Sequence, residues 1–308
     1  MRKQDYIFLA FTLGAMVVGV FMPFLAEPLR WFPKIAMLSL LFLCFLTIDG
    51  HAVWENITQY PTAILFAVTL KLVILPVICW LLFQWILPQY ALGAAIIGGC
   101  ATAVSAPFFA YVVLADHALV LVSVVSTSLL LPFVLPAILA LLGSFAAIEG
   151  GIVVDMPVFS MIANLAFMTA GPFALAQIVR RNKMVTEYIL SWKQSAFLVG
   201  TSGSNVAIFA QYSSVILQTP QTMLVALSAS FLVFAVLFLV PAVLLCKLPP
   251  EKHLAFVISC VAINNVLALI TCLEYFSLNE VLLSAMYSVP FFFALVFYRL
   301  LGRIRNHL

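Results

Sequence analysis

The stretch SAPFF, residues 105–109, interrupts an apolar run that extends from residue 91 to residue 114. Such a run is long enough to cross a bilayer, which takes about 20 apolar residues. Pro107 has no backbone N–H and breaks a regular helix. At membrane depth, broken backbone is tolerated only inside protein or beside a water-filled cavity. The stretch therefore predicts a broken helix next to a pathway, with a proline kink in a lipid-facing helix as the alternative.

A second apolar run is interrupted by INNVL, residues 263–267, with Asn264 and Asn265 near its middle. Two adjacent amides are costly in an apolar environment unless they are hydrogen-bonded. The two interrupted runs are the fourth and ninth of ten apolar segments. These segments, which we interpret as membrane spans, are 5–26, 33–49, 61–87, 91–114, 117–143, 156–179, 189–212, 221–246, 254–273 and 279–301.

The composition supports this interpretation. Hydrophobic residues make up 65% of the 308 residues and charged residues only 8%, whereas soluble domains are about one quarter charged. The runs are continuously apolar rather than alternating, which excludes a porin-like barrel. The sequence predicts an all-α polytopic membrane protein, and the scattered bases behind a net charge of +3 give no indication of nucleic-acid binding.

The N-terminal apolar stretch is long for a signal peptide and lacks a clear cleavage site, so we expect it to be the first helix. The six cysteines lie in or beside apolar runs and form no CxxC pair. We expect buried free thiols rather than disulfides or metal ligands.

The basic residues indicate an orientation. With ten spans both termini lie on one side, and that side holds eleven bases, against Arg30 and Lys34 on the other. The positive-inside rule then predicts cytoplasmic termini. The eleven bases are Arg2, Lys3, Arg180, Arg181, Lys183, Lys193, Lys247, Lys252, Arg299, Arg303 and Arg305.

Ten spans can form two sets of five, and an odd-numbered unit repeated in tandem must be inverted in the membrane. Pro76 and Pro241 lie late in the third and eighth spans, and the fourth and ninth are both interrupted. We therefore predict two inverted five-helix repeats in which broken helices 4 and 9 cross.

One lysine lies inside a span. Lys71, in AVTLKLVILP (residues 67–76), is about 15 Å from the start of its helix at 1.5 Å per residue. A lysine at a helix centre costs about 2.5–3.5 kcal/mol on the insertion scale. Three roles remain open: a tethered cation that contacts carbonyls of the broken helices, a proton-coupling group, or a side chain that snorkels to an interface.

An intramembrane enzyme is not expected. GTSG, residues 200–203, resembles a serine-protease nucleophile motif, but the four histidines lie in loops or at termini and none offers an embedded base. We interpret GTSG as a small-residue packing patch or cavity lining, and we expect no cofactor.

Three segments carry a family resemblance: ALVLVSVVSTSLLLPFVLP (118–136), NNVLAL (264–269) and SAMYSV (284–289). The chain resembles the bile acid:sodium symporter family, in a bacterial form, within a group that includes arsenite and auxin-type carriers. This implies one transporter unit over residues 1–308, in a bacterial inner membrane. Panel helices would lie within 1–60 and 156–212, and core helices within 61–143 and 221–301, with substrate between core and panel.

The resemblance also implies two sodium sites, which this chain has largely lost. A glutamate ligand of the family aligns with Ser259, a glutamine with Ile263, and a Ser-Asn pair with Ala106 and Pro107. A glutamine in the third span aligns with Lys71, which would supply a positive charge in place of a sodium ligand. We therefore predict degenerate sodium sites.

The predicted function is secondary active transport of a small organic anion or amphipathic acid by alternating access, symporter-like but independent of sodium, with proton coupling as an option. The alternatives are a non-transporting receptor or scaffold on the same fold, and an auxin-efflux-like carrier. The bilayer and the substrate are the expected partners, and the oligomeric state stays open. The expected cavity-lining residues are Ser105, Ser126, Thr127, Ser128, Asn264, Asn265 and Ser288.

Overall fold

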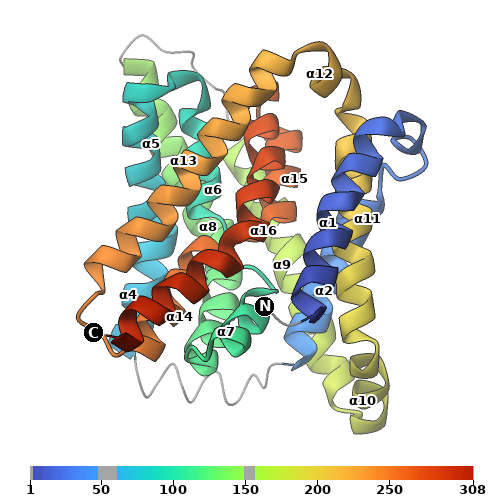
Figure 1. Ribbon diagram of the computed structural model, residues 1–308, viewed down its shortest axis with the longest axis vertical. Helices are drawn as coiled ribbons and strands as arrows, with labels where there is room; N and C mark the ends of the chain where they lie inside the picture. The colour runs from blue at the N-terminus through green and yellow to red at the C-terminus, as the bar shows by residue number, and fades with distance from the viewer. Residues whose placement is uncertain (1–2, 48–60, 149–156, 308) are drawn as a thin grey trace. The chain divides into compact units, whose positions relative to one another are not determined.

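The computed structural model describes residues 3–47, 61–148 and 157–307. Within these residues every regular element is a helix (Figure 1), which confirms the all-α prediction. Arg2 and much of the two loops expected near residues 50 and 150 lie outside the described residues. The chain separates into two compact units, 1–49 with 170–226 and 50–169 with 227–308.

The first unit holds helices from both its segments. They are α1 (Lys3–Phe21), the short 3₁₀ helix η1 (Pro23–Leu25), α2 (Phe32–Thr47), the last part of α9 (Val158–Arg180), α10 (Lys183–Ser191), α11 (Lys193–Gln211), α12 (Ser213–Gln218) and the start of α13 (Pro220–Leu244). The helix expected over residues 189–212 instead begins at Lys193, because residues 183–191 form the separate helix α10.

Glycines allow the helices of this unit to approach closely. A Cβ on Gly19 of α1 would lie 2.6 Å from the carbonyl oxygen of Val206 in α11, so only glycine permits this contact. Gly200 and Gly203 of α11 likewise face Leu40 and Phe32 of α2. GTSG is therefore a packing patch in this unit.

The second unit holds the interrupted helices. Its elements are α4 (Pro61–Thr69), the π-helical turn η2 (Leu70–Ile74), α5 (Leu75–Ile86), η3 (Pro88–Tyr90), α6 (Ala91–Gly99), α7 (Ala106–Val113), α8 (His117–Ile148), the first part of α9, most of α13, α14 (Pro250–Val261), α15 (Asn265–Tyr275) and α16 (Leu278–His307).

A proline explains the π-helical turn that carries Lys71. In a regular α-helix the residue at position 76 would donate its N–H to Leu72, but Pro76 has no N–H to donate. The helix widens instead, and the N–H of Leu75 bonds to Leu70, five residues back. Such π-turns are frequent at functional sites.

The two predicted interruptions are confirmed. The first separates α6 from α7, where Gly98 and Gly99 end one helix and Pro107 lies in the first turn of the next. Proline suits a first turn because its missing N–H needs no partner there. Pro107 is buried, so the alternative of a proline kink in a lipid-facing helix is wrong.

The second interruption separates α14 from α15. Asn264 is the N-cap of α15, and its side-chain oxygen accepts a hydrogen bond from Leu267 N at 3.2 Å. Within the second unit, α6 and α15 lie toward one end, and α7 and α14 toward the other (Figure 1). The two breaks therefore bring four helix ends together in the middle of the unit.

Four of the described helices are individually long and apolar enough to cross a membrane, and a fifth qualifies if the two halves of α16, bent by 51°, are one span. The four are Ile64–Ile86, His117–Phe145, Val158–Arg180 and Pro220–Leu244. Neither the pair α6 and α7 nor the pair α14 and α15 counts, since each is split. The ten-span count and the inverted repeat stay predictions.

The expected assignment to panel and core also stays a prediction. Both α9 and α13 pass from one unit into the other, near Ala170 and Leu227.

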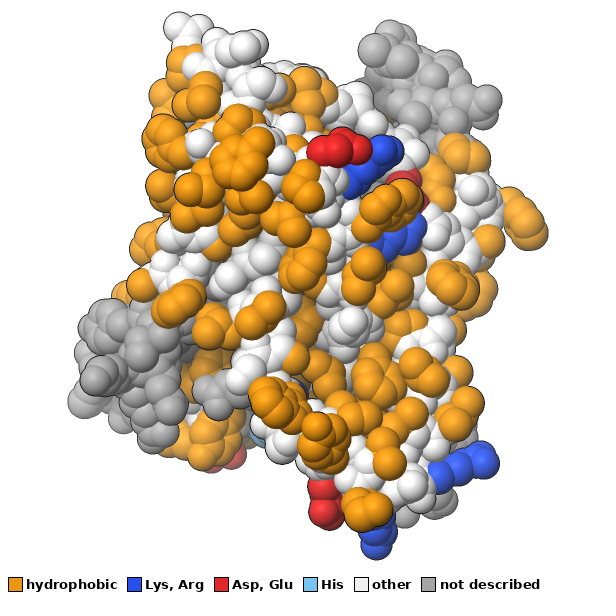
Figure 2. All heavy atoms as spheres, turned by 90° about the vertical axis from the view of Figure 1, so that its right-hand side faces the viewer, with side chains coloured by type: hydrophobic (Ala, Val, Ile, Leu, Met, Phe, Trp, Pro, Cys, Tyr) orange, Lys and Arg blue, Asp and Glu red, His pale blue; other side chains and the backbone are white. Residues whose placement is uncertain are grey.

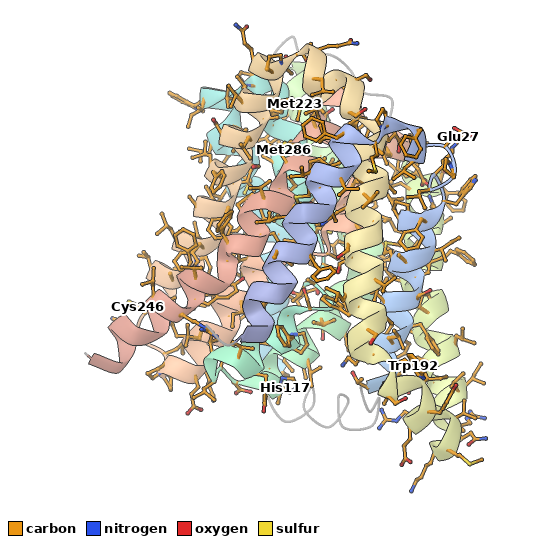
Figure 3. The ribbon with its side chains drawn as sticks, turned by 45° about the vertical axis from the view of Figure 1, so that its right-hand side comes forward. Glu27, His117, Trp192, Met223, Cys246 and Met286 are labelled. Carbon is orange, nitrogen blue, oxygen red and sulfur yellow. The ribbon has the colours of Figure 1, made fainter. Side chains whose placement is uncertain are left out.

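One expectation about the cysteines is wrong. Five of them are buried free thiols, but Cys246 is exposed, because it follows the end of α13 (Figure 3).

Candidate functional site

The two breaks of the second unit pair with each other through their backbones. The N–H of Ala103 donates to the carbonyl of Ala262 at 2.6 Å, and the N–H of Asn264 donates to the carbonyl of Ala101 at 2.8 Å. Thr102 and Ile263 form an antiparallel bridge between these bonds. The freed backbone groups thus find partners inside protein, as an apolar surrounding requires. We call this region, residues 100–105 and 262–264, the crossover.

Hydrogen-bond donors close the C-terminal end of α14. The last carbonyls of a helix have no partner within the helix, yet four consecutive carbonyls here each accept a hydrogen bond. Their donors are Thr102 Oγ1 to Ser259 (2.9 Å), Lys71 Nζ to Cys260 (2.7 Å), Tyr287 Oη to Val261 (2.9 Å) and Ala103 N to Ala262 (2.6 Å).

Lys71 therefore meets the negative end of a helix dipole. A cation at a helix C-terminus is favourable because the unpaired carbonyls carry partial negative charge. Only 1% of the Lys71 side chain is exposed, so the alternative of snorkelling to an interface is wrong. Among the described residues, the ionisable groups in electrostatic range of Lys71 are the thiols of Cys79, Cys100 and Cys260, and no carboxylate is among them.

Three more of the predicted residues make side-chain hydrogen bonds at or beside the crossover. Thr127 of α8 accepts a hydrogen bond from Thr102 N at 3.0 Å. Asn265, at the start of α15, donates through Nδ2 to Ser288 Oγ of α16 at 2.7 Å. Asn265 is partly exposed while Ser288 is buried, so this pair lies at a partly exposed edge of the crossover.

The remaining predicted positions differ in whether their side chains can coordinate an ion. Ser105 precedes α7, Ala106 and Pro107 begin it, and Ile263 lies in the second break. The side chains of alanine, proline and isoleucine have no atom that could coordinate an ion. Any ligand at these three positions would have to come from the backbone.

Several buried polar atoms near the crossover make no hydrogen bond within the described residues. Such atoms are rare in proteins, and each needs an explanation, such as a bound ligand or water. Those on predicted site residues are Ser126 Oγ, Ser128 Oγ, Ser259 Oγ, Asn264 Nδ2 and Asn265 Oδ1.

Comparison with known proteins identifies the family. Residues 34–219, more than half of the chain, match the sodium bile acid symporter family. The chain belongs to this family. No curated protein matches it. Members of the symporter family are transporters rather than enzymes, and the apolar helices agree with an integral membrane protein.

Two residues of this symporter-family site were missed by sequence reasoning, Thr102 and Tyr287. Both are buried and both donate to α14. Each lies beside serines that are as plausible a polar contact, Ser105 near Thr102 and Ser288 next to Tyr287, so the sequence does not single it out. Their position beside SAPFF and within SAMYSV was the signal available, but only the fold shows which carbonyl each one reaches.

Tyr287→Phe is expected to destabilise the symporter fold. The change removes one hydroxyl and leaves the Val261 carbonyl buried without its donor, which costs about 1–3 kcal/mol. Tyr298→Phe is the matched control, because Tyr298 is equally buried on the same helix but its hydroxyl makes no hydrogen bond within the described residues. Thermal unfolding in detergent should show a lower midpoint for Tyr287→Phe only. Equal midpoints for the two variants would contradict the role of Tyr287.

Proposed function

We propose that the chain is a secondary active transporter that moves a small organic anion or amphipathic acid by alternating access without using sodium. The hydrogen bond from Lys71 Nζ to the Cys260 carbonyl carries this proposal. It supports a fixed ammonium at the crossover, held where the resemblance places a sodium ligand.

The chemistry of the α14 end argues against a sodium ion there. Sodium binds oxygen acceptors and is repelled by other cations. The four carbonyls from Ser259 to Ala262 already accept hydrogen bonds. Ser259 offers a neutral hydroxyl where the resemblance expects a carboxylate, and the Lys71 ammonium would oppose a second cation.

A tethered cation fits these contacts better than a proton carrier. The Lys71 side chain is held at the C-terminal end of α14 by the Cys260 carbonyl, which is the arrangement that a tethered cation requires. The bond to Cys260 gives the ammonium a permanent structural role. We therefore favour the tethered cation. The uptake assay described below distinguishes it from proton coupling.

The unpartnered polar atoms favour a polar substrate near the crossover. Ser126, Ser128, Ser259, Asn264 and Asn265 each hold a side-chain atom that a carboxylate, hydroxyl or water could satisfy. The N-termini of α7 and α15 add partial positive charge, which suits an anion. Substrate binding there would also explain why these polar groups are retained in an apolar protein.

The proposal includes the finer architecture. It has ten spans in two inverted repeats, panel helices within 1–60 and 156–212, core helices within 61–143 and 221–301, and cytoplasmic termini in a bacterial inner membrane. Support comes from the positions of the two breaks, which fall in the fourth and ninth apolar runs, and from the distribution of bases.

Uptake into proteoliposomes tests the function. A bile acid and a panel of short monocarboxylates serve as labelled probes, with empty liposomes as the control. We expect saturable uptake of at least one probe, at equal rates in sodium and in potassium buffers, and the assay is run with and without a pH gradient.

Each alternative gives a different result. Sodium-stimulated uptake would contradict the loss of the sodium sites, and stimulation by a pH gradient would favour proton coupling. Binding of a probe without any uptake would favour the receptor or scaffold alternative.

A further inference from the structure

Helix α10 is a separate element between two long helices of the first unit. Asn182 ends the turn after α9 and caps α10, since its side-chain oxygen accepts a hydrogen bond from Val185 N at 3.3 Å. No residue of α10 is buried. The helix contacts α2 and α11, and its partly covered residues are Thr186, Ile189 and Leu190.

A stripe of large apolar side chains lies on another face of α10. Met184, Tyr188 and Trp192 are spaced by four residues, which places them one above the other along a helix. Their exposed fractions are 78%, 69% and 60%. Trp192 marks the junction of α10 with α11 (Figure 3). The protein therefore leaves this stripe uncovered.

Basic side chains accompany the stripe. Arg181, Lys183 and Lys193 are exposed at the two ends of α10, while Glu187 is the acidic residue of the helix. Figure 2 shows blue, red and orange side chains together at the lower edge of the view. The inference rests on the proposed orientation, in which the distribution of bases places this loop on the cytoplasmic side, and the cytoplasmic leaflet is the one rich in anionic lipids.

The geometry points to α10 as an interfacial helix that binds anionic phospholipid. The stripe of Met184, Tyr188 and Trp192 inserts at the boundary between headgroups and acyl chains, and Arg181, Lys183 and Lys193 contact lipid phosphates. Tyrosine and tryptophan suit this depth because each has an apolar ring and a polar tip. An apolar face combined with basic residues is the pattern of helices that lie in the membrane surface.

A membrane explains the surface better than a protein partner does. The ends of α10 continue into α9 and α11, two long helices of an integral membrane protein, so the helix is held next to the bilayer. A soluble partner would need to cover the same stripe beside the lipid. The basic residues also match phosphate groups, which every anionic phospholipid carries.

A fluorescent probe at two neighbouring positions tests the proposal. In a Cys246→Ser background the remaining described cysteines are buried, so a thiol-reactive probe labels an introduced cysteine. Tyr188→Cys places the probe on the stripe, and Glu187→Cys, one residue away, places it on the polar edge. The labelled proteins are reconstituted in nanodiscs with brominated phosphatidylcholine as quencher, with and without phosphatidylglycerol.

We expect the bilayer to quench the probe at position 188 about twofold or more relative to position 187, as an amphipathic surface helix requires. Phosphatidylglycerol should increase quenching at position 188. The combined variant Arg181→Gln, Lys183→Gln and Lys193→Gln should remove that increase, whereas Lys247→Gln, an exposed base elsewhere, should keep it. Equal quenching at the two positions, or no effect of phosphatidylglycerol, would overturn the proposal. A probe at 188 that stays in water in both lipids would point to a protein partner instead.

Discussion

Lys71→Met is expected to lower transport by about a hundredfold. Methionine has a similar shape but no charge and no N–H, so the Cys260 carbonyl loses its donor at the crossover. A hydrogen bond to a charged group contributes about 2–3 kcal/mol to the transporting state. Each loss of about 1.4 kcal/mol lowers a rate tenfold, so losing this bond lowers the transport rate by about a hundredfold. Uptake of whichever probe the wild type transports measures the loss.

Stability should respond less than transport. The orphaned carbonyl and the lost contact with the helix dipole destabilise the variant. Against this, the variant no longer buries an ammonium, and that desolvation penalty is several kcal/mol. These opposing terms have similar size, so the thermal midpoint is expected to move little while uptake falls.

Two further variants separate charge from hydrogen bonding. Lys71→Gln keeps an N–H donor without the charge, and Lys247→Met removes a lysine from an exposed position as the matched control. If the charge matters, Lys71→Gln transports as poorly as Lys71→Met, and Lys247→Met transports normally. Wild-type uptake by both Lys71 variants would contradict any role of the ammonium.

The double variant Lys71→Gln with Ser259→Glu is expected to gain a response to sodium. It removes the fixed cation, adds a carboxylate at the end of α14, and leaves the Cys260 carbonyl with a neutral neighbour. These are the two changes that alter charge among those that separate this chain from the sodium-binding pattern implied by its family resemblance. A sodium concentration 100 times the dissociation constant would stabilise the fold by about 2.7 kcal/mol.

The thermal midpoint in sodium chloride, compared with the same concentration of potassium chloride, measures this gain. Neither single variant should respond, because Lys71→Gln lacks the carboxylate and Ser259→Glu retains the ammonium, which would pair with the new carboxylate. A folded double variant with equal midpoints in both salts would contradict the assignment of the site. A sodium response in the wild type would contradict its sodium independence.

Local sequence was enough to locate both breaks. Gly98, Gly99 and Pro107 disrupt a helix whatever surrounds them, because their effects act through the backbone of their own segment. Asn264 caps a helix through a hydrogen bond three residues away. The depth of Lys71 in an apolar run was also visible in the sequence, but its burial and the π-helical turn around it came from the structure.

Other features could not be read from local patterns. Thr102 and Tyr287 each have serines close by in the sequence, and local patterns do not show which hydroxyl reaches a carbonyl of α14. Helix α10 was expected to be loop and the start of a span, because its apolar residues merge with those of α11. Only its packing on α2 shows that one face is covered and that the stripe with Met184 is not.

By itself, the sequence determined an all-helical membrane chain, the position of its interruptions and the presence of one lysine far inside an apolar run. These depend on composition, on run length and on interactions within a few residues. The tertiary structure alone decided what that lysine binds. Lys71 and Cys260 are separated by 189 residues. Every residue has a backbone carbonyl, so the residue type at position 260 does not indicate that its carbonyl accepts this hydrogen bond.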